Sequence, residues 1–176
     1  MEIEVKLIYN NRAKILAWLK KNKFKLAKKK EIKDSYYGVG QNSMSGISSF
    51  YRIRNVVGIF TELTLKDSFQ EKDGIVTRRE INVTIDDPEK MAIILTSLGG
   101  NLFKEHASKR EIWENGRVQF ELIDYYKPTI LHLIEIEGPN NEIIQSLINS
   151  LGDEVKVAGD GIFSAFDKKV KGTNKE

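Results

Sequence analysis

The segment EIEVKLIY, residues 2–9, alternates charged and apolar side chains. Glu2, Glu4 and Lys6 fall on one parity, and the apolar residues between them fall on the other. Successive side chains of a strand point to opposite faces of a sheet, so this period of two predicts a strand with one charged and one apolar face. The charged face meets either water, as in an ordinary amphipathic strand, or a ligand.

The same alternation recurs in later segments of the chain: SFYRIRN (49–55), TELTLKD (61–67), TRREINVTI (77–85) and LIEIEGP (133–139). In an open antiparallel sheet, helices cover the apolar face and water covers the charged one, which accounts for any one of these strands taken alone. Taken together, the segments gather basic residues and carboxylates on one face. These residues are Arg52, Arg54, Glu62, Lys66, Arg78, Glu80, Glu135 and Glu137.

The remaining pattern predicts the α+β fold class. Helical spacing of apolar residues appears at 12–21, in DDPEKMAIILTSLGG (86–100) and in PNNEIIQSLINSLGD (139–153). Asn115-Gly116 and Asp73-Gly74 are hairpin turn signals, so we expect antiparallel pairing. About eight strands are expected, in a sheet that could curl or close. Their ranges are 3–9, 28–37, 50–55, 60–66, 76–85, 102–113, 117–125 and 130–137, with surface loops at 37–49 and in KDSFQEKD (66–73).

Composition narrows the class of protein. A chain of 176 residues, 40% hydrophobic and 30% charged, is typical of one globular domain, which we take as residues 1–176. The net charge of +3 is not a nucleic-acid-binding signature, and no apolar run is long enough for a membrane span. With no cysteine and only two histidines, a metal would have to be held by oxygen ligands. The default expectation is a cytoplasmic protein, and a homodimer is left open.

The carboxylate pairs favour a ligand over water. Glu2 and Glu4, like Glu135 and Glu137, lie about 7 Å apart at their Cα atoms on a strand, so both members can reach one cation. If the sheet closes with its charged face inward, the interior of about eight strands holds side chains or one small ligand. Unmatched charge there costs several kcal/mol. A polyphosphate with divalent cations matches both signs, because carboxylates bind hard cations and Arg and Lys bind phosphate oxygens.

At this point the motifs resemble a known family. EIEVK at the N-terminus is similar to the ExExK signature of CYTH domains, also called triphosphate tunnel metalloenzymes, which include class IV adenylyl cyclases, thiamine triphosphatases and inorganic triphosphatases. The resemblance continues in order through DSYY, RIR, LTLK, RRE, KRE, LIDYY and EIEG, which covers nearly the whole chain. It implies a closed or nearly closed antiparallel barrel, the triphosphate tunnel, with helices packed outside.

The resemblance also implies a role for each matching residue. Mg²⁺ or Mn²⁺ would be bound by Glu2, Glu4, Glu135 and Glu137. The triphosphate would be bound by Lys6, Arg52, Arg54, Lys66, Arg78 and Arg110. Catalytic acidic positions on the metal side would be Glu80 and Asp124, although a strand-end role accounts for Asp124 equally well. Departures from the family pattern occur at Ser108, Asn82 and the C-terminal GIFSAFDKK.

Three functions remain open at this stage. The first is metal-dependent hydrolysis of inorganic triphosphate or of a nucleoside or other organic triphosphate. The second is a class IV adenylyl cyclase, in which the ribose 3′-hydroxyl attacks the α-phosphorus and pyrophosphate leaves. The third is a non-catalytic module for polyphosphate or the triphosphate end of RNA, motivated by the basic run at residues 28–30, which a solvated strand edge explains as well.

Overall fold

The structure is a computed structural model, and it describes residues 2–38 and 49–158. Within them the chain forms nine strands and three α-helices. The strands are β1 (Glu2–Tyr9), β2 (Lys25–Gly38), β3 (Phe50–Val56), β4 (Phe60–Lys72), β5 (Ile75–Ile85), β6 (Leu102–Asn115), β7 (Val118–Lys127), β8 (Leu131–Glu137) and β9 (Val155–Val157). The helices are α1 (Arg12–Lys21), α2 (Pro88–Ser97) and α3 (Asn141–Leu151), and a 3-10 turn (Gly152–Glu154) precedes β9.

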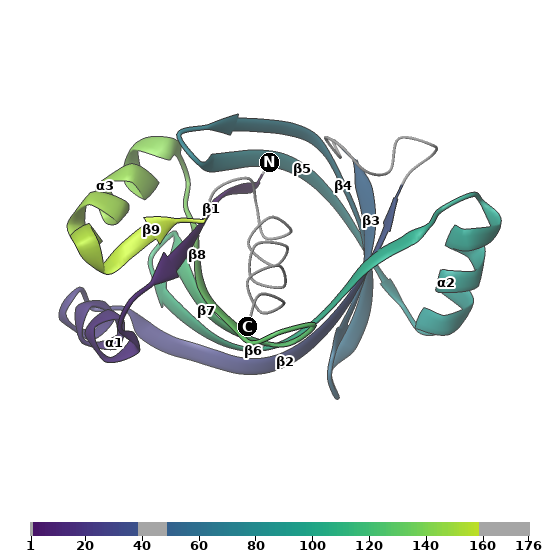
Figure 1. The fold of residues 1–176 in the computed structure, drawn as a ribbon, viewed down its shortest axis with the longest axis horizontal. Coiled ribbons are helices and arrows are strands. Elements are labelled where there is room, and N and C mark those ends of the chain that lie inside the picture. Colours follow the sequence, from purple (N-terminus) through teal and green to yellow (C-terminus); the bar gives the residue numbers. More distant parts are fainter. Residues whose placement is uncertain (1, 39–48, 159–176) are drawn as a thin grey trace, which may run out of the picture.

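Eight of these strands close into an antiparallel barrel. The sheet order is β5-β4-β3-β2-β6-β7-β8-β1-β9, and a further pairing of β1 with β5 joins the two ends of the eight-stranded part. In that seam Glu2 lies opposite Arg78 and Val5 lies opposite Ile75. Figure 1 looks down the resulting ring, with the three helices outside it. The predicted α+β fold with a closed barrel is therefore confirmed.

The main apolar core lies outside the barrel wall. Alternate residues of β1, β7 and β8 turn outward and pack against α1 and α3. A second cluster, which includes Ile53 and Leu95, packs α2 onto the outer face of β3. Full burial of one large apolar side chain contributes about 1.5–3 kcal/mol, so these outer layers hold the wall together while the inner face remains available for charge. The side chains of the first cluster that are completely buried are Leu7, Ile15, Leu19, Phe120, Leu122, Ile134, Ile136 and Ile144.

The tight turn between β4 and β5 packs closely against β9. Asp73 and Gly74 both have positive φ, as in the tight turns that match the twist of a hairpin. A Cβ on Gly74 would lie 2.5 Å from the Val157 side chain of β9, so the close approach of these segments also requires glycine. The predicted Asp73-Gly74 hairpin is thus confirmed, and so is the Asn115-Gly116 hairpin, because β6 and β7 pair antiparallel with Asn115 opposite Val118.

Some boundaries differ from the predictions. KDSFQEKD is not a loop, because β4 runs on to the tight turn, with a register shift between Asp67 and Gln70. The strand β2 begins at Lys25, and the short β9 was not anticipated. Most of the predicted loop at 37–49 lies outside the described residues, as does GIFSAFDKK. The side chains of Asp87 and Asn140 cap the N-termini of α2 and α3. Within the described residues, no helix is both long and apolar enough to span a membrane.

Candidate active site

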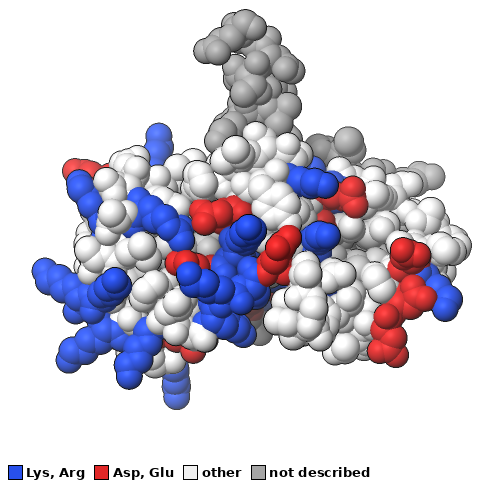
Figure 2. Space-filling view, turned by 90° about the horizontal axis from the view of Figure 1, so that it is seen from below, with Lys and Arg blue, Asp and Glu red and all other residues white. Residues whose placement is uncertain are grey.

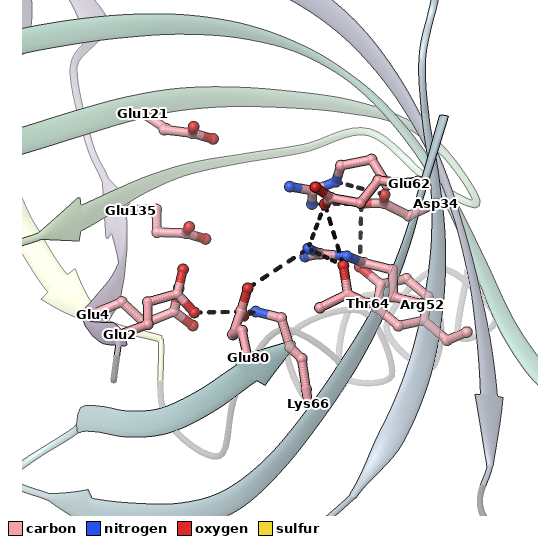
Figure 3. A network of polar contacts seen from close by, with 12 residues as sticks. Glu2, Glu4, Asp34, Arg52, Glu62, Thr64, Lys66, Glu80, Glu121 and Glu135 are labelled. Carbon is pink, nitrogen blue, oxygen red and sulfur yellow. Dashed lines mark hydrogen bonds and ion pairs between the residues drawn. The ribbon is translucent and has the colours of Figure 1, made fainter. Parts of the chain in front are cut away.

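The inner face of the barrel is lined by charged side chains from all eight strands. Figure 3 shows the carboxylates of Glu2, Glu4, Glu121 and Glu135 on one side of the interior, facing Arg52 on the other side. Burying so many charges is tolerable only when they are matched by one another or by a ligand. The charged residues that are almost completely buried are Glu4, Asp34, Arg52, Lys66, Arg110, Glu121 and Glu135.

Three carboxylates converge on the inner face where β1 pairs with β8. One oxygen of each of Glu2, Glu4 and Glu137 lies within 4.8 Å of the others. The register sets Glu4 directly opposite Glu137 on β8. Burial raises the pKa of Glu2 to about 7, and burial together with the nearby Glu135 raises the pKa of Glu137 to about 8. Three crowded carboxylates that resist ionisation fit a hard divalent cation, which supplies the missing positive charge through oxygen ligands.

The fourth predicted metal ligand has a different partner. Glu135 pairs with Lys6, whose Nζ lies 2.9 Å from its carboxylate and also contacts Glu4. Burial opposes ionisation of Glu135, but Lys6 and Arg110 outweigh it and hold the pKa of Glu135 well below its ordinary value. The structure therefore brings Glu2, Glu4 and Glu137 together and joins Glu135 to them through Lys6.

Lys66 and Glu80 connect the carboxylates to the basic side of the interior. Lys66 forms an ion pair with Glu80 and lies 3.3 Å from Glu2, while Glu80 lies 3.9 Å from Arg52. Arg52 Nη2 donates to the Thr64 hydroxyl at 3.2 Å. Among the described residues, the buried Arg52 Nε has no hydrogen-bond acceptor. An unsatisfied buried donor costs about 1–3 kcal/mol, and an anion bound in the interior would remove that cost.

Asp34 and Glu121 orient two further guanidinium groups, and neither was among the predicted site residues. Asp34 accepts two hydrogen bonds from Arg54, at 2.8 and 2.9 Å, and lies 3.7 Å from Arg110. Arg110 in turn donates to Glu121 at 2.6 Å. Burial opposes the charge on Asp34, yet Arg54 overcomes it and holds the pKa of Asp34 well below its ordinary value. The site therefore contains arginines that are already held in fixed orientations.

Arg78 lies on the inner face at the edge of an aromatic cluster. Its guanidinium carbon is 5.0 Å from the centre of the Phe50 ring, an arrangement that favours a cation over the ring face. Tyr36 contacts both Phe50 and His106 through its ring. Burial lowers the pKa of His106 to about 4, so this imidazole is neutral near pH 7.

Asp124 is placed apart from all of these residues. Its carboxylate lies 2.7 Å from His132 Nδ1 and 3.3 Å from Arg12 of α1, on the outer surface of the barrel. The reason is parity: Glu121 and Tyr125 turn inward from β7, so Asp124 turns outward. The expectation that Asp124 belongs to the metal side of the interior is corrected accordingly.

The missed residues carried a weak signal in the sequence. Asp34 opens the DSYY motif and has the parity of Tyr36, whose hydroxyl donates to it at 3.3 Å. Glu121 shares its inward face with the apolar Ile123, so the strand lacks the clean alternation that marked the other segments. Both Asp34 and Glu121 occupy the alternate positions that face inward on their strands, so the period of two identifies them even where the strand also carries apolar inward residues.

The amino-acid sequence is similar to that of known proteins. A family model described as the CYTH domain matches residues 1–150. A protein of Methanocaldococcus jannaschii provisionally named as an adenylate cyclase is 36% identical over 114 residues, 65% of this chain and 62% of that protein. The chain therefore spans less than two thirds of that relative's length.

Solved structures share the fold at lower identity. The PH1012 protein of Pyrococcus horikoshii OT3 superposes with a TM-score of 0.73 at 22% identity, covering 89% of this chain and 94% of that one. The Hippeastrum protein HpAC1, described as a candidate adenylyl cyclase with a dominant triphosphatase activity, superposes with a TM-score of 0.71 at 18% identity, covering 96% of each chain.

The raised pKa values predict how stability depends on pH without divalent cations. Glu2 and Glu137 have folded pKa values of about 7 and about 8, above that of an ordinary glutamate. The folded state then retains protons that the unfolded state has released, so stability falls as pH rises. We expect the free energy of unfolding, measured in urea, to fall by at least about 1 kcal/mol between about pH 6 and about pH 8.

Glu137→Gln is the matched variant for this measurement, because the glutamine side chain is neutral at every pH. It should lose most of the dependence, and added Mg²⁺ or Mn²⁺ should flatten the wild-type curve. A slope that is the same in Glu137→Gln and the wild-type protein would contradict the placement of Glu137 among the crowded carboxylates.

The Asp34 network predicts a large stability effect. Asp34→Ala leaves Arg54 buried without its carboxylate, and breaking a buried ion pair in this way costs about 3–5 kcal/mol. Asp67→Ala is the matched control, because Asp67 also pairs through two hydrogen bonds with an arginine, Arg79, but at an exposed position. Its effect on the urea midpoint should be much smaller, and equal losses in the two variants would rule out the buried network as a major source of stability.

Proposed function

The chain belongs to the CYTH domain family, and from that premise we propose that it is a divalent-metal-dependent triphosphatase acting inside the barrel. One observation carries the proposal: three converging carboxylates line the same barrel interior as a set of oriented basic groups. A triphosphate with a divalent cation satisfies both clusters at once, because it brings negative oxygens and positive charge together.

The acidic residues would bind the cation, and the basic residues would bind the phosphate oxygens. Glu2, Glu4 and Glu137 would hold the cation, with Glu135 close by through Lys6. When bound, such a cation polarises phosphate oxygens and lowers the pKa of water. Phosphate oxygens would be bound by Lys66, Arg52, Arg54, Arg78 and Arg110.

Positioning accounts for most of the catalysis in phosphoryl transfer, so no protein nucleophile is required. Glu80 would orient Lys66 and accept a hydrogen bond from the attacking water. Burial opposes ionisation of Glu80, but its hydrogen bond with Glu2 and the charge of Lys66 leave the pKa of Glu80 lowered. It is therefore suited to orienting water rather than to removing a proton. Arg54 and Arg110, already held by Asp34 and Glu121, would bind with little reorganisation.

Adenylyl cyclase activity is the second candidate, favoured by the name of the Methanocaldococcus jannaschii relative. The same metal and phosphate groups would serve that reaction, but cyclisation also requires groups that orient the adenine and the ribose. Hydrolysis ranks first because water is the only further reactant that it needs.

Substitutions of the site should abolish turnover. With Mg²⁺ or Mn²⁺ at saturation, Glu4→Gln and Arg52→Ala should each lower kcat/KM for tripolyphosphate at least about 100-fold, since each removes a charge-assisted contact in a low-dielectric interior. Asp124→Asn, on the outer surface, should stay within about threefold of wild type. Unchanged turnover in Glu4→Gln or Arg52→Ala would reject this placement of the site.

The products distinguish the candidate functions. Orthophosphate from tripolyphosphate, lost on chelation of the metal, supports the triphosphatase. Cyclic AMP with pyrophosphate from ATP supports the cyclase instead. Tight metal-dependent binding of tripolyphosphate without any product would support the non-catalytic binding module.

A further inference from the structure

Positive charge is concentrated in one part of the chain. Residues 12–33 contain ten Lys or Arg and a single acidic residue, Glu31, so this segment carries a formal charge of +9 against +3 for the whole protein. Figure 2 shows Lys and Arg side chains gathered at the side of the molecule where α1 and the start of β2 lie. The segment therefore attracts anions although the protein as a whole is nearly neutral.

Three of these lysines lie on the inner face of β2. Lys30 lies opposite Arg110, and both donate to the buried Glu121, at 3.1 and 2.6 Å. Lys28 lies opposite Ile112, which has the inward parity of Arg110. A bulge between Leu26 and Lys28 then shifts the register by one residue, so that Lys25 lies opposite Glu114, on the same inward parity.

The outer face of β2 has other partners. Leu26 lies opposite Trp113, which belongs to the outer apolar core. Lys29 pairs with Glu111 at 2.7 Å, beside Arg12 of α1. The bulge thus keeps Lys25 on the inward side, where a regular strand would have turned it outward.

The inward lysines lead from Arg110 in the interior to the rim of the barrel, where β2 begins. Asn115 Nδ2 donates to the backbone oxygen of Asn22, so the β6–β7 turn and the end of α1 meet where β2 begins. At the strand rise of about 3.3 Å per residue, Lys25 and Lys30 lie on the order of 15 Å apart. Lys25 and Lys28 are exposed, and neither forms an ion pair with another described residue.

We propose that Lys25, Lys28 and Lys30 form a binding track for the distal phosphates of a linear polyphosphate longer than three units, whose end occupies the barrel interior. The inference rests on the proposed function, since it extends the same phosphate-binding wall outward. A ligand that contacts both Arg110 and Lys25 must be longer than a triphosphate and must carry negative charge along its length.

The surroundings favour polyphosphate over single-stranded nucleic acid. Proteins that bind single strands combine a basic groove with aromatic side chains on which bases stack. Along α1 and the first half of β2, the aromatic residues are Trp18 and Phe24, which pack against each other and against Phe120 of the outer core. A chain of phosphates needs charge alone, which is what the track presents.

The test compares ligand lengths in direct binding assays with Mg²⁺ present, near physiological ionic strength, using tripolyphosphate and a defined long linear polyphosphate. The Lys25→Glu/Lys28→Glu variant should weaken binding of the long chain at least about tenfold, and this loss should exceed its loss for tripolyphosphate at least about fivefold. Circular dichroism checks that the variant is folded.

Lys33→Glu/Lys109→Glu is the matched control, because it reverses the same amount of charge at exposed positions on the outer face of β2 and of its neighbour β6. It should leave both affinities unchanged. Equal losses in the two double variants, or equal affinity of the wild-type protein for the short and long ligands, would overturn the track. Single-stranded RNA binding as tightly as polyphosphate would also overturn it. A lack of turnover would reject the proposed hydrolysis but not the track, because the track is tested only by these ratios of binding affinity.

Discussion

Closure of the barrel by β1 and β5 is the constraint on which the rest of the structure depends. Once the sheet closes, the polar face of every strand shares one enclosed interior, where an unmatched charge costs several kcal/mol. Each charged residue must then have a partner of opposite sign. Glu135 with Lys6 and Asp34 with Arg54 meet that requirement within the protein itself.

The places where matching is incomplete indicate what the interior binds. Glu2, Glu4 and Glu137 crowd together, and burial together with neighbouring carboxylates raises the pKa values of Glu2 and Glu137. On the opposite side, the buried Arg52 Nε has no acceptor among the described residues. The crowded carboxylates favour a cation and the buried donor favours an anion, and this pair of features is the basis for proposing a triphosphate with a divalent metal as the ligand.

The position of the apolar core makes such an interior possible. Because α1 and α3 pack against the outside of the wall, the burial that stabilises the fold does not compete for space with the charged face. Substitutions inside the barrel therefore act mainly through charge balance, and substitutions of outward residues such as Leu7 act through packing. The bulge in β2 is an example, because its extra residue changes which lysines turn inward while Leu26 still faces the outer core opposite Trp113.

The sequence by itself determined which residues share a face, because a period of two is a local property of a strand. It also predicted the helices, both hairpin turns and, through the family resemblance, most of the charged residues that line the interior. Only the tertiary structure decided which of them meet. The register of β1 against β8 sets Glu4 opposite Glu137 and Lys6 opposite Glu135, so three predicted ligands converge and the fourth pairs with a lysine. Register likewise sets Asp34 opposite Arg54 and Glu121 opposite Glu135, because contacts between strands depend on register, which no single segment encodes.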